Sequence, residues 1–215
     1  MILFIGGPPR VGKGVLTRNI SKKLRIPYIS TDALRQAARE LPAIPKTDNL
    51  FKSEPLGEGD NQEEFFKHTK VEDIIDFQNK ESEEVARLVK GIVEYFNWSK
   101  EQYIIEGVAL LPRFYTKEFI KGNNIVFITV GNTDFDTFFK FSWDHRVNGD
   151  WLGKTSKEAF EKVIKFSSEF SKNFQDEANK FGYPYYEVNS KDFNHHMINI
   201  TEEVVKNIKD NYKDF

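Results

Sequence analysis

The residues best suited to chemistry stand near the start of the chain, in a run that fits the pattern G-x-x-x-x-G-K. The run and the residues directly after it are Gly7, Pro8, Pro9, Arg10, Val11, Gly12, Lys13, Gly14 and Val15. Glycines in such a run let the backbone curl, so that successive N–H groups point inward at phosphate oxygens. Lys13 adds a positive charge for the outer phosphates. The pattern therefore predicts that this run binds the phosphate chain of a nucleotide.

The segments around the run are those that a phosphate-binding loop requires, a strand before it and a helix after it. Residues 1–5 are apolar throughout, which is typical of a strand buried on both faces of a parallel sheet. Leu16, Ile20 and Leu24 then recur at helical spacing. The alternative is a Gly-Pro turn that only joins the strand to the helix. The strand, the spacing and the lysine together favour a binding loop.

The residue after the lysine bears on magnesium. Many loops of this kind have Ser or Thr there, and its hydroxyl holds Mg²⁺. Position 14 is glycine, which supplies no such ligand. We expect Mg²⁺ to be held by phosphates, water and a carboxylate such as Glu106. The sequence leaves open whether any side chain binds the metal.

The rest of the chain alternates short apolar runs with longer amphipathic stretches. The apolar runs predict further strands at 26–29, 103–105, 125–130 and 185–188. Apolar residues at helical spacing predict helices at 15–24, 33–40, 85–96, 135–143, 160–181 and 197–212. Strands that alternate with helices form a parallel sheet with helices on both faces. We therefore expect one α/β domain over residues 1–215, a three-layer sandwich around a five-stranded parallel sheet.

Two segments interrupt this alternation. Residues 41–80 show a weak pattern punctuated by prolines and by a Gly-Glu-Gly-Asp cluster at 57–60. We therefore expect an irregular segment there, with short helical pieces at 63–67 and 71–77. A loop of this length in a compact domain is usually functional or mobile. Residues 147–155 contain Gly149 and Gly153 and predict a second loop.

The composition narrows the class of protein. Of the 215 residues 39% are apolar, which is enough for a packed core and excludes a mainly disordered chain. The net charge of 31 − 33 = −2 gives no overall basic surface for a nucleic-acid partner. The absence of cysteine excludes a disulfide scaffold and any thiolate metal site. No apolar run approaches the roughly 20 residues that cross a bilayer, so we expect a soluble, cytoplasmic protein without a membrane partner. The oligomeric state is left open.

Three blocks of sequence resemble known kinases. Residues 7–14, read as Gly-x-Pro-x-x-Gly-Lys-Gly, are similar to the phosphate loop of the adenylate kinase branch of nucleoside monophosphate kinases. Residues 29–35, Ile-Ser-Thr-Asp-Ala-Leu-Arg, resemble the acceptor segment Ile-Ser-Thr-Gly-Asp-Met-Leu-Arg of that family, one residue shorter. Residues 104–112 resemble the Ile-Glu-Gly-Val-His-Leu-x-Pro segment of 2-phosphoglycerate kinase-like proteins, with Ala109 in place of the histidine.

The resemblance, which covers roughly half of the chain in separate blocks, implies a P-loop NTPase fold of the nucleoside monophosphate kinase type. It implies ATP and Mg²⁺ as cofactors, an acceptor-side insertion at about 41–80 and a lid at about 146–156. In the adenylate kinase branch the Thr and Arg of the second block contact the acceptor nucleotide. Thr31 and Arg35 are the matching positions here.

Asp32 and Arg35 are the principal candidates on the acceptor side. Asp32 follows the second predicted strand, at the edge where ligands of an open α/β sheet collect. A carboxylate there can accept the proton of an acceptor hydroxyl, a role that the resemblance also implies; the alternative is a helix N-cap. Arg35 can hold a carboxylate or phosphate of the acceptor by two parallel hydrogen bonds. Its alternative is an exposed helix arginine.

Three further charged residues complete the candidates. Glu106 ends an apolar strand, where the superfamily places a carboxylate near the metal or the acceptor; it can equally be a capping residue. Arg113 can reach an anionic acceptor. Arg146 opens the second loop, and in the resembling kinases a lid there brings arginines onto the transferring phosphoryl group. The alternative for Arg146 is a surface ion pair with Asp144.

These observations together predict an ATP-dependent phosphotransferase that acts on a small acceptor, either a nucleoside monophosphate or a small phosphorylated or hydroxylated metabolite. Lys13, Asp32 and Arg146 are the predicted catalytic residues, and Thr31, Arg35, Glu106 and Arg113 are the predicted acceptor contacts. Two alternatives stay open. One is a P-loop ATPase or nucleotide-dependent switch without a small acceptor, and the other is an ATP-binding relative that has lost catalysis.

Overall fold

The computed structural model describes residues 1–40, 62–147 and 151–212. The irregular chain expected at 41–61 and the middle of the expected lid, at 148–150, lie outside these ranges. None of the described helices combines the length and the apolar character needed to cross a membrane.

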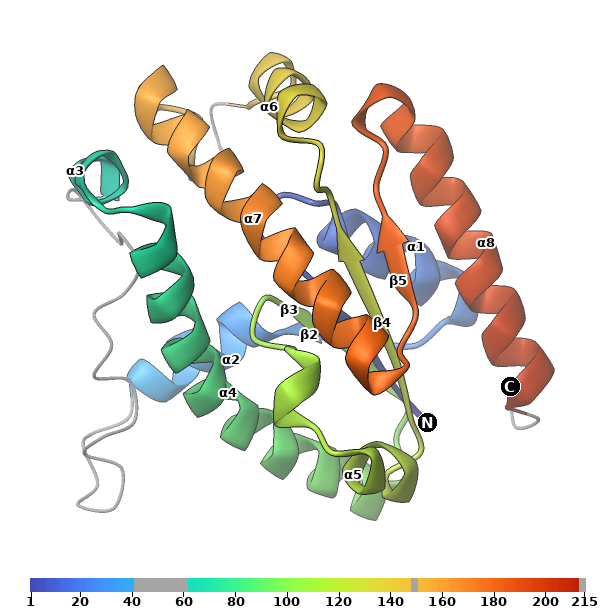
Figure 1. The fold of residues 1–215 in the computed structure, drawn as a ribbon. Coiled ribbons are helices and arrows are strands. Elements are labelled where there is room, and N and C mark those ends of the chain that lie inside the picture. The colour runs from blue at the N-terminus through green and yellow to red at the C-terminus, as the bar shows by residue number, and fades with distance from the viewer. Residues whose placement is uncertain (41–61, 148–150, 213–215) are drawn as a thin grey trace.

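Five parallel strands form one sheet in the order β2-β3-β1-β4-β5 (Figure 1). They are β1 (Ile2–Gly6), β2 (Tyr28–Ser30), β3 (Tyr103–Gly107), β4 (Ile125–Gly131) and β5 (Tyr185–Glu187). The five-stranded parallel sheet expected from the sequence is confirmed. Because β1 lies between β3 and β4, the segment that follows β1 leaves the sheet at the centre of its carboxyl edge.

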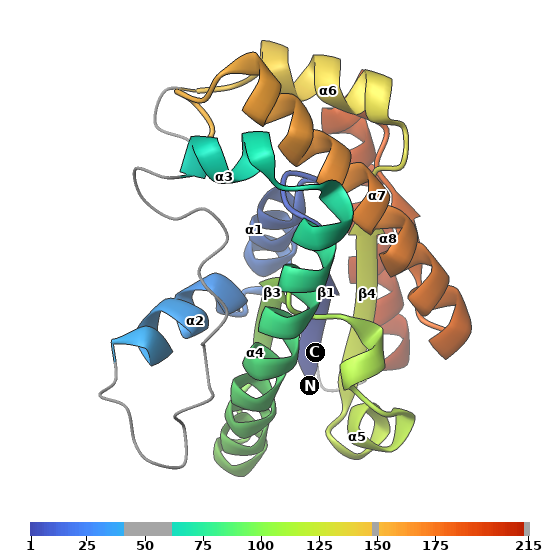
Figure 2. The same cartoon turned by 60° about the vertical axis from the view of Figure 1, so that its left-hand side comes forward.

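Helices cover both faces of the sheet, as the expected three-layer sandwich requires (Figures 1 and 2). One face carries α4 (Val71–Ser99), α5 (Lys117–Gly122) and α7 (Lys157–Phe181). The other carries α1 (Lys13–Leu24) and α8 (Phe193–Asn211). The remaining helices are α2 (Thr31–Arg39), α3 (Gln62–His68) and α6 (Phe135–Asp144). In the chain, α2 follows the carboxyl end of β2, α6 follows that of β4, and α3 precedes α4.

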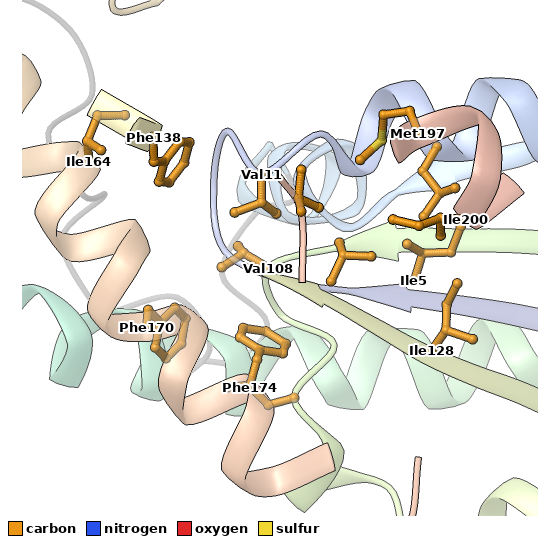
Figure 3. Close-up of a cluster of buried hydrophobic side chains, with 14 of the residues drawn as sticks. Ile5, Val11, Val108, Ile128, Phe138, Ile164, Phe170, Phe174, Met197 and Ile200 are labelled. Carbon is orange, nitrogen blue, oxygen red and sulfur yellow. The ribbon is translucent and has the colours of Figure 1, made fainter. Parts of the chain in front are cut away.

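The side chains of β1 alternate between two hydrophobic cores. Ile2 and Phe4 join the core that α4 and α5 close, whereas Leu3 and Ile5 join the core closed by α1 and α8. Figure 3 shows part of the second core, to which α7 and the loop after β1 also contribute. The central strand is therefore buried on both faces, and this burial fixes the position of the loop that follows it.

The prediction for residues 62–80 is wrong in one respect. Instead of an irregular segment with a short helical piece at 71–77 and a separate helix at 85–96, the chain forms one continuous helix, α4. The buried side of α4 carries Gln78, Glu81 and Ser82 between its apolar residues. These polar residues break the apolar periodicity, and the periodicity was the only local signal for a helix here.

Candidate functional site

The loop between β1 and α1 has the geometry of an anion-binding site. Gly12 caps α1 in a left-handed conformation, with φ 94°, which glycine adopts without steric cost. Its carbonyl accepts hydrogen bonds from Val15 N and Leu16 N, each at 3.0 Å. No side chain caps the N-terminus of α1. The first N–H groups of the helix and its positive dipole end are thus presented to the loop, where they favour a negatively charged ligand.

Gly12 is also required by its surroundings. A Cβ atom at this position would lie 2.9 Å from the ring of Phe193, at the start of α8. The ring of Phe193 in turn stacks on Phe141 of α6, with 5.1 Å between centroids. The loop is therefore packed against the segments that lead into α8 and out of α6, so its curvature is fixed from outside as well as by its own glycines.

Lys13 is the cation at the centre of the site. Its Nζ donates a hydrogen bond of 2.5 Å to the carbonyl oxygen of Pro8, across the loop. Burial lowers the pKa of Lys13 below its ordinary value, while the nearby carboxylates of Glu106 and Asp32 act to raise it. The structure thus brings together three residues that the sequence predicted separately. The positive charge of Lys13 is flanked by two negative ones.

The sheet register explains how Glu106 reaches this position. β3 lies between β2 and β1, and Glu106 is the register partner of Ser30 on one side and Ile5 on the other. Glu106 therefore stands at the carboxyl edge, next to the point where β1 gives way to the phosphate loop. Strands at such an edge deliver their last side chains to a common crevice. Glu106 therefore lies near the phosphate loop, and its role toward the metal or the acceptor stays a prediction.

The structure tests the helix-cap interpretation of Asp32. The N-cap of α2 is Ser30, whose Oγ accepts a hydrogen bond of 3.1 Å from Asp32 N. The carboxylate of Asp32 is therefore not needed to cap the helix and is exposed beside Lys13. Ser30, directly before the first residue of α2, is the N-cap in place of Asp32.

Thr31 lies at the buried contact between α2 and the end of β3. Its side chain is 1% exposed and packs directly on Gly107 at the end of β3. A Cβ atom at position 107 would lie 1.7 Å from Thr31 Oγ1, so only glycine fits there. Thr31 Oγ1 is buried without a hydrogen-bond partner among the described residues. In this structure Thr31 joins α2 to β3, and its contact with an acceptor stays a prediction.

Arg35 is held by a residue that sequence reasoning missed. Its Nη1 lies 3.0 Å from Oε1 of Glu81, and Arg39 Nη2 lies 3.5 Å from Oε2 of the same carboxylate. Glu81 is on α4 and only 2% exposed. The available signal was a set of polar residues, Gln78, Glu81 and Ser82, spaced so that one side of a helix turns polar. That signal is weak without knowledge of α2, which supplies the partners.

Two predicted arginines lie in other surroundings. Arg113 pairs with Glu177 of α7, and its Nη2 donates to Asn79 Oδ1 at 3.4 Å, so it joins the loop after β3 to α4 and α7. Arg146 follows α6, and its guanidinium carbon lies 3.4 Å from the centroid of the Trp143 ring. An aromatic ring is thus the partner of Arg146 in the described structure. Their predicted contacts with the acceptor and the phosphoryl group stay predictions.

Arg10 and Val11 complete the loop. Val11 is 1% exposed and belongs to the core shown in Figure 3. Arg10 has a left-handed backbone, with φ 65°, and its guanidinium carbon lies 5.4 Å from the ring centroid of Phe160 on α7. Buried Val11 anchors the tip of the loop, while Arg10 spans from the loop to the helix that follows the expected lid.

Oxygen ligands for a metal ion are available but few. No group of three or more His, Cys, Asp or Glu residues suited to a metal ion occurs in the part of the chain that the structure describes. Asp32 and Glu106, both beside Lys13, offer carboxylate oxygens of the kind that Mg²⁺ prefers. Thr17, one turn into α1, is fully buried and faces the core. The residues present fit a magnesium ion that takes most of its ligands from phosphates and water.

The fold and the loop together define the class of structure: the chain has the fold of P-loop small-molecule kinases. The chain superposes on a shikimate kinase from Bacteroides thetaiotaomicron with a TM-score of 0.51 at 13% identity, covering 97% of this chain and 98% of that one. A deoxyadenosine kinase from M. mycoides, solved with bound dATP, aligns over 95% and 99% of the two chains at 16% identity and a TM-score of 0.45.

One curated protein is similar in sequence. A 2-phosphoglycerate kinase from Methanocaldococcus jannaschii is 22% identical over 169 residues, which make up 77% of this chain. The chain spans about half the length of that relative, 50%. No model of a known protein family matches the sequence. The similarity to the shikimate kinase structure therefore supports the fold alone, and the chemistry has to be argued from the site.

Proposed function

We propose that the protein is an ATP-dependent phosphotransferase that moves the γ-phosphoryl group of ATP to a small acceptor. The observation that carries this proposal is the cluster of Lys13, Asp32 and Glu106 at the N-terminus of α1. A lysine and helix amides suit a triphosphate, and carboxylates beside them suit an acceptor hydroxyl and a metal ion. The similarity to a 2-phosphoglycerate kinase and to the fold of a shikimate kinase supports the same class of reaction.

In this proposal residues 7–15 bind the phosphates of ATP. The amides of the loop and of the first turn of α1 donate to phosphate oxygens, and Lys13 exchanges its hydrogen bond with Pro8 for the β- and γ-phosphates. Mg²⁺, when bound, would neutralise phosphate charge, with Glu106 or Asp32 contributing a carboxylate oxygen. The exchange requires Lys13 to be protonated, and the two adjacent carboxylates favour that state.

Asp32 acts on the acceptor. The acceptor hydroxyl oxygen forms a bond to the γ-phosphorus, the bond from that phosphorus to the β–γ bridging oxygen breaks, and ADP leaves. The hydroxyl proton passes to the carboxylate of Asp32. Where the acceptor atom is already a phosphate oxygen, no proton has to move, and Asp32 then serves to orient the acceptor.

The remaining assignments are part of the same proposal. Residues 1–215 form a single kinase domain in which the segment at about 41–80 contributes to the acceptor side. The segment at about 146–156 is a lid that carries Arg146. Closure would move Arg146 from the ring of Trp143 to the transferring phosphoryl group, where positive charge stabilises the transition state. Arg35 binds the acceptor, and Arg113 is a second candidate for contact with an anionic acceptor.

The test is ADP formation from ATP and Mg²⁺, measured with each member of an acceptor panel and without any acceptor. AMP, 2-phosphoglycerate, shikimate and glycerol represent the acceptor classes. Stimulation of turnover by an acceptor, lost in Lys13→Ala, supports the kinase. Steady hydrolysis that no acceptor changes would support an ATPase or switch instead. Stabilisation by ATP in thermal unfolding without any turnover would indicate a binding protein that has lost catalysis.

A further inference from the structure

The position directly after Lys13 is where the phosphate loop lacks the hydroxyl that many such loops use to hold Mg²⁺. Gly14 supplies no side chain there, but a polar group from the next turn of α1 lies beside it. A Cβ atom on Gly14 would be 3.4 Å from Nη1 of Arg18, which is an ordinary contact distance. The guanidinium group of Arg18 therefore lies next to the place of the missing hydroxyl.

The helix itself brings Arg18 to this position. Arg18 is four residues after Gly14 on α1, and side chains of a helix lean toward its N-terminus, so Arg18 reaches back over Gly14. Arg18 is exposed and has no ion-pair or hydrogen-bond partner among the residues that the structure describes. The first turn of α1 also contains no acidic residue. An uncompensated cation thus lies near the positive end of the helix dipole, and this arrangement favours a bound anion.

The charges around Lys13 show why a second cation would be useful. Lys13 lies near the carboxylates of Asp32 and Glu106, so negative groups outnumber the positive one in its immediate surroundings. Arg10, earlier in the loop, lies over an aromatic ring of α7. A triphosphate brings several further negative charges to this place. Arg18 is the residue of α1 that adds a positive charge beside the first turn without a carboxylate next to it.

A guanidinium group and a hydroxyl at this place would act on phosphate in different ways. A serine or threonine hydroxyl acts mainly by holding Mg²⁺, which in turn binds the phosphate oxygens. A guanidinium group donates two parallel hydrogen bonds to phosphate oxygens directly, and it stays charged over the whole physiological range of pH. Glycine at position 14 leaves room for the guanidinium group, so Gly14 and Arg18 have to be considered together.

We propose that Arg18 is a second phosphate-binding residue, which takes over part of the charge neutralisation that Mg²⁺ provides in loops with a hydroxyl after the lysine. This inference rests on the proposed phosphotransferase function and deepens it. The phosphate chain of ATP is bound by two cationic side chains, Lys13 and Arg18, together with the loop amides. Binding of ATP therefore persists when Mg²⁺ is removed, and the part of Mg²⁺ in the transfer step is unchanged.

The test is equilibrium binding of ATP by calorimetry, measured without acceptor, once with Mg²⁺ and once with EDTA. For Arg18→Gln we expect the Kd in EDTA to rise about 10-fold, since a charge-assisted contact with phosphate is lost. With Mg²⁺ the rise should be only about 3-fold, because the metal ion then neutralises part of the phosphate charge. Arg18→Lys, which keeps the charge without the planar fork, should recover part of the loss.

Two further variants separate a local contact from general electrostatics. Lys22→Gln removes one positive charge from the same face of α1, about 6 Å farther along the axis, and should change the Kd by less than about 2-fold. Gly14→Ser restores the hydroxyl, and its Cβ fits beside Arg18 without a clash. This variant should raise the ratio of the Kd in EDTA to the Kd with Mg²⁺ by about 10-fold, because the hydroxyl favours the metal-bound nucleotide.

Folding of the variants is checked by thermal unfolding without nucleotide. Arg18 and Lys22 are both exposed, so Arg18→Gln and Lys22→Gln should unfold at the same temperature as the unmodified protein. A change in the Kd of Arg18→Gln then reports on the nucleotide site and not on the stability of α1.

The outcomes separate this inference from the function on which it rests. If the unmodified protein binds ATP neither with Mg²⁺ nor in EDTA, the proposed nucleotide site is overturned, and this inference with it. If an acceptor stimulates ADP formation but ATP does not bind in EDTA, the phosphotransferase stands and the weak dependence on Mg²⁺ is overturned. If Arg18→Gln binds ATP in EDTA as tightly as the unmodified protein, or if Lys22→Gln weakens binding equally, the role of Arg18 is overturned.

Discussion

The phosphate loop and the proposed acceptor side of this protein are built in different ways. The loop is a single continuous segment whose glycines, lysine and flanking strand and helix all lie within residues 1–24. The acceptor side is assembled from α2, the end of β3 and α4, which are distant in the sequence. The geometry of the loop therefore does not depend on the residues of the acceptor side. Proteins of the same fold can in this way combine one type of nucleotide site with different acceptor sites.

The comparison predicts that changes in the loop abolish the reaction with every acceptor. Lys13→Ala removes the ammonium group that bonds across the loop to the Pro8 carbonyl, and with it the stabilisation of charge on the transferring phosphoryl group. We expect kcat/KM for ATP to fall by roughly 10²- to 10³-fold, the usual cost of removing one preorganised donor to a transition state. ADP formation with saturating acceptor measures it. Activity retained within a few fold would place the nucleotide elsewhere.

A change at Asp32 should affect the acceptor step and leave the fold intact. Because Ser30 caps α2, Asp32→Asn should cost little stability, but it should lower kcat by about 10²-fold with a hydroxyl acceptor. Ser30→Ala is the matched control, with the opposite effects: about 1 kcal/mol less stable and a nearly unchanged kcat. Thermal unfolding and initial rates on both variants are sufficient. Equal losses of stability would show that Asp32 supports the helix after all.

The contact between α2 and β3 can be tested without touching a charged group. Gly107→Ala would place a methyl group on Thr31 Oγ1, and overpacking of this kind costs about 1–3 kcal/mol. We expect the variant to bind ATP with nearly normal affinity, while the KM for the acceptor rises because α2 shifts. Chemical unfolding and a nucleotide-binding titration follow the two effects separately. The double variant Gly107→Ala/Thr31→Ala should recover part of the stability, and no recovery would mean that the overlap lies elsewhere.

The same contrast explains how much of the molecule the sequence predicts. The loop and the five strands follow from local patterns, so their predicted limits agree closely with the structure. The ion pairs of Arg35 and Arg39 with Glu81 depend on how α2 packs against α4, and the Thr31–Gly107 contact depends on which strands are neighbours and in which register. No local pattern in the sequence contains that information. The continuous helix α4 was not predicted, because Gln78, Glu81 and Ser82 are buried but polar. A helix is recognised from apolar residues at helical spacing, and that pattern is interrupted at these positions.

The smallest expected effect concerns the protonation of Lys13. Its pKa lies below the ordinary value in the folded protein, since burial outweighs the neighbouring carboxylates. Between that lowered pKa and the ordinary one the unfolded chain binds more protons, so the free energy of unfolding without nucleotide should rise with pH. ATP affinity should fall over the same range, because neutral Lys13 no longer attracts phosphate.

The free energy of unfolding and the ATP affinity should therefore change with pH in opposite directions. Each corresponds to a change of no more than about 10-fold in the equilibrium constant per pH unit. Urea unfolding without nucleotide, together with ATP titrations in alkaline buffers, would measure them. Lys13→Arg is the control, because a guanidinium stays charged throughout this range and both slopes should disappear. If ATP affinity weakened equally in Lys13→Arg, the alkaline loss would belong to another group. The loop would then bind phosphate through its amides, with little help from the lysine charge.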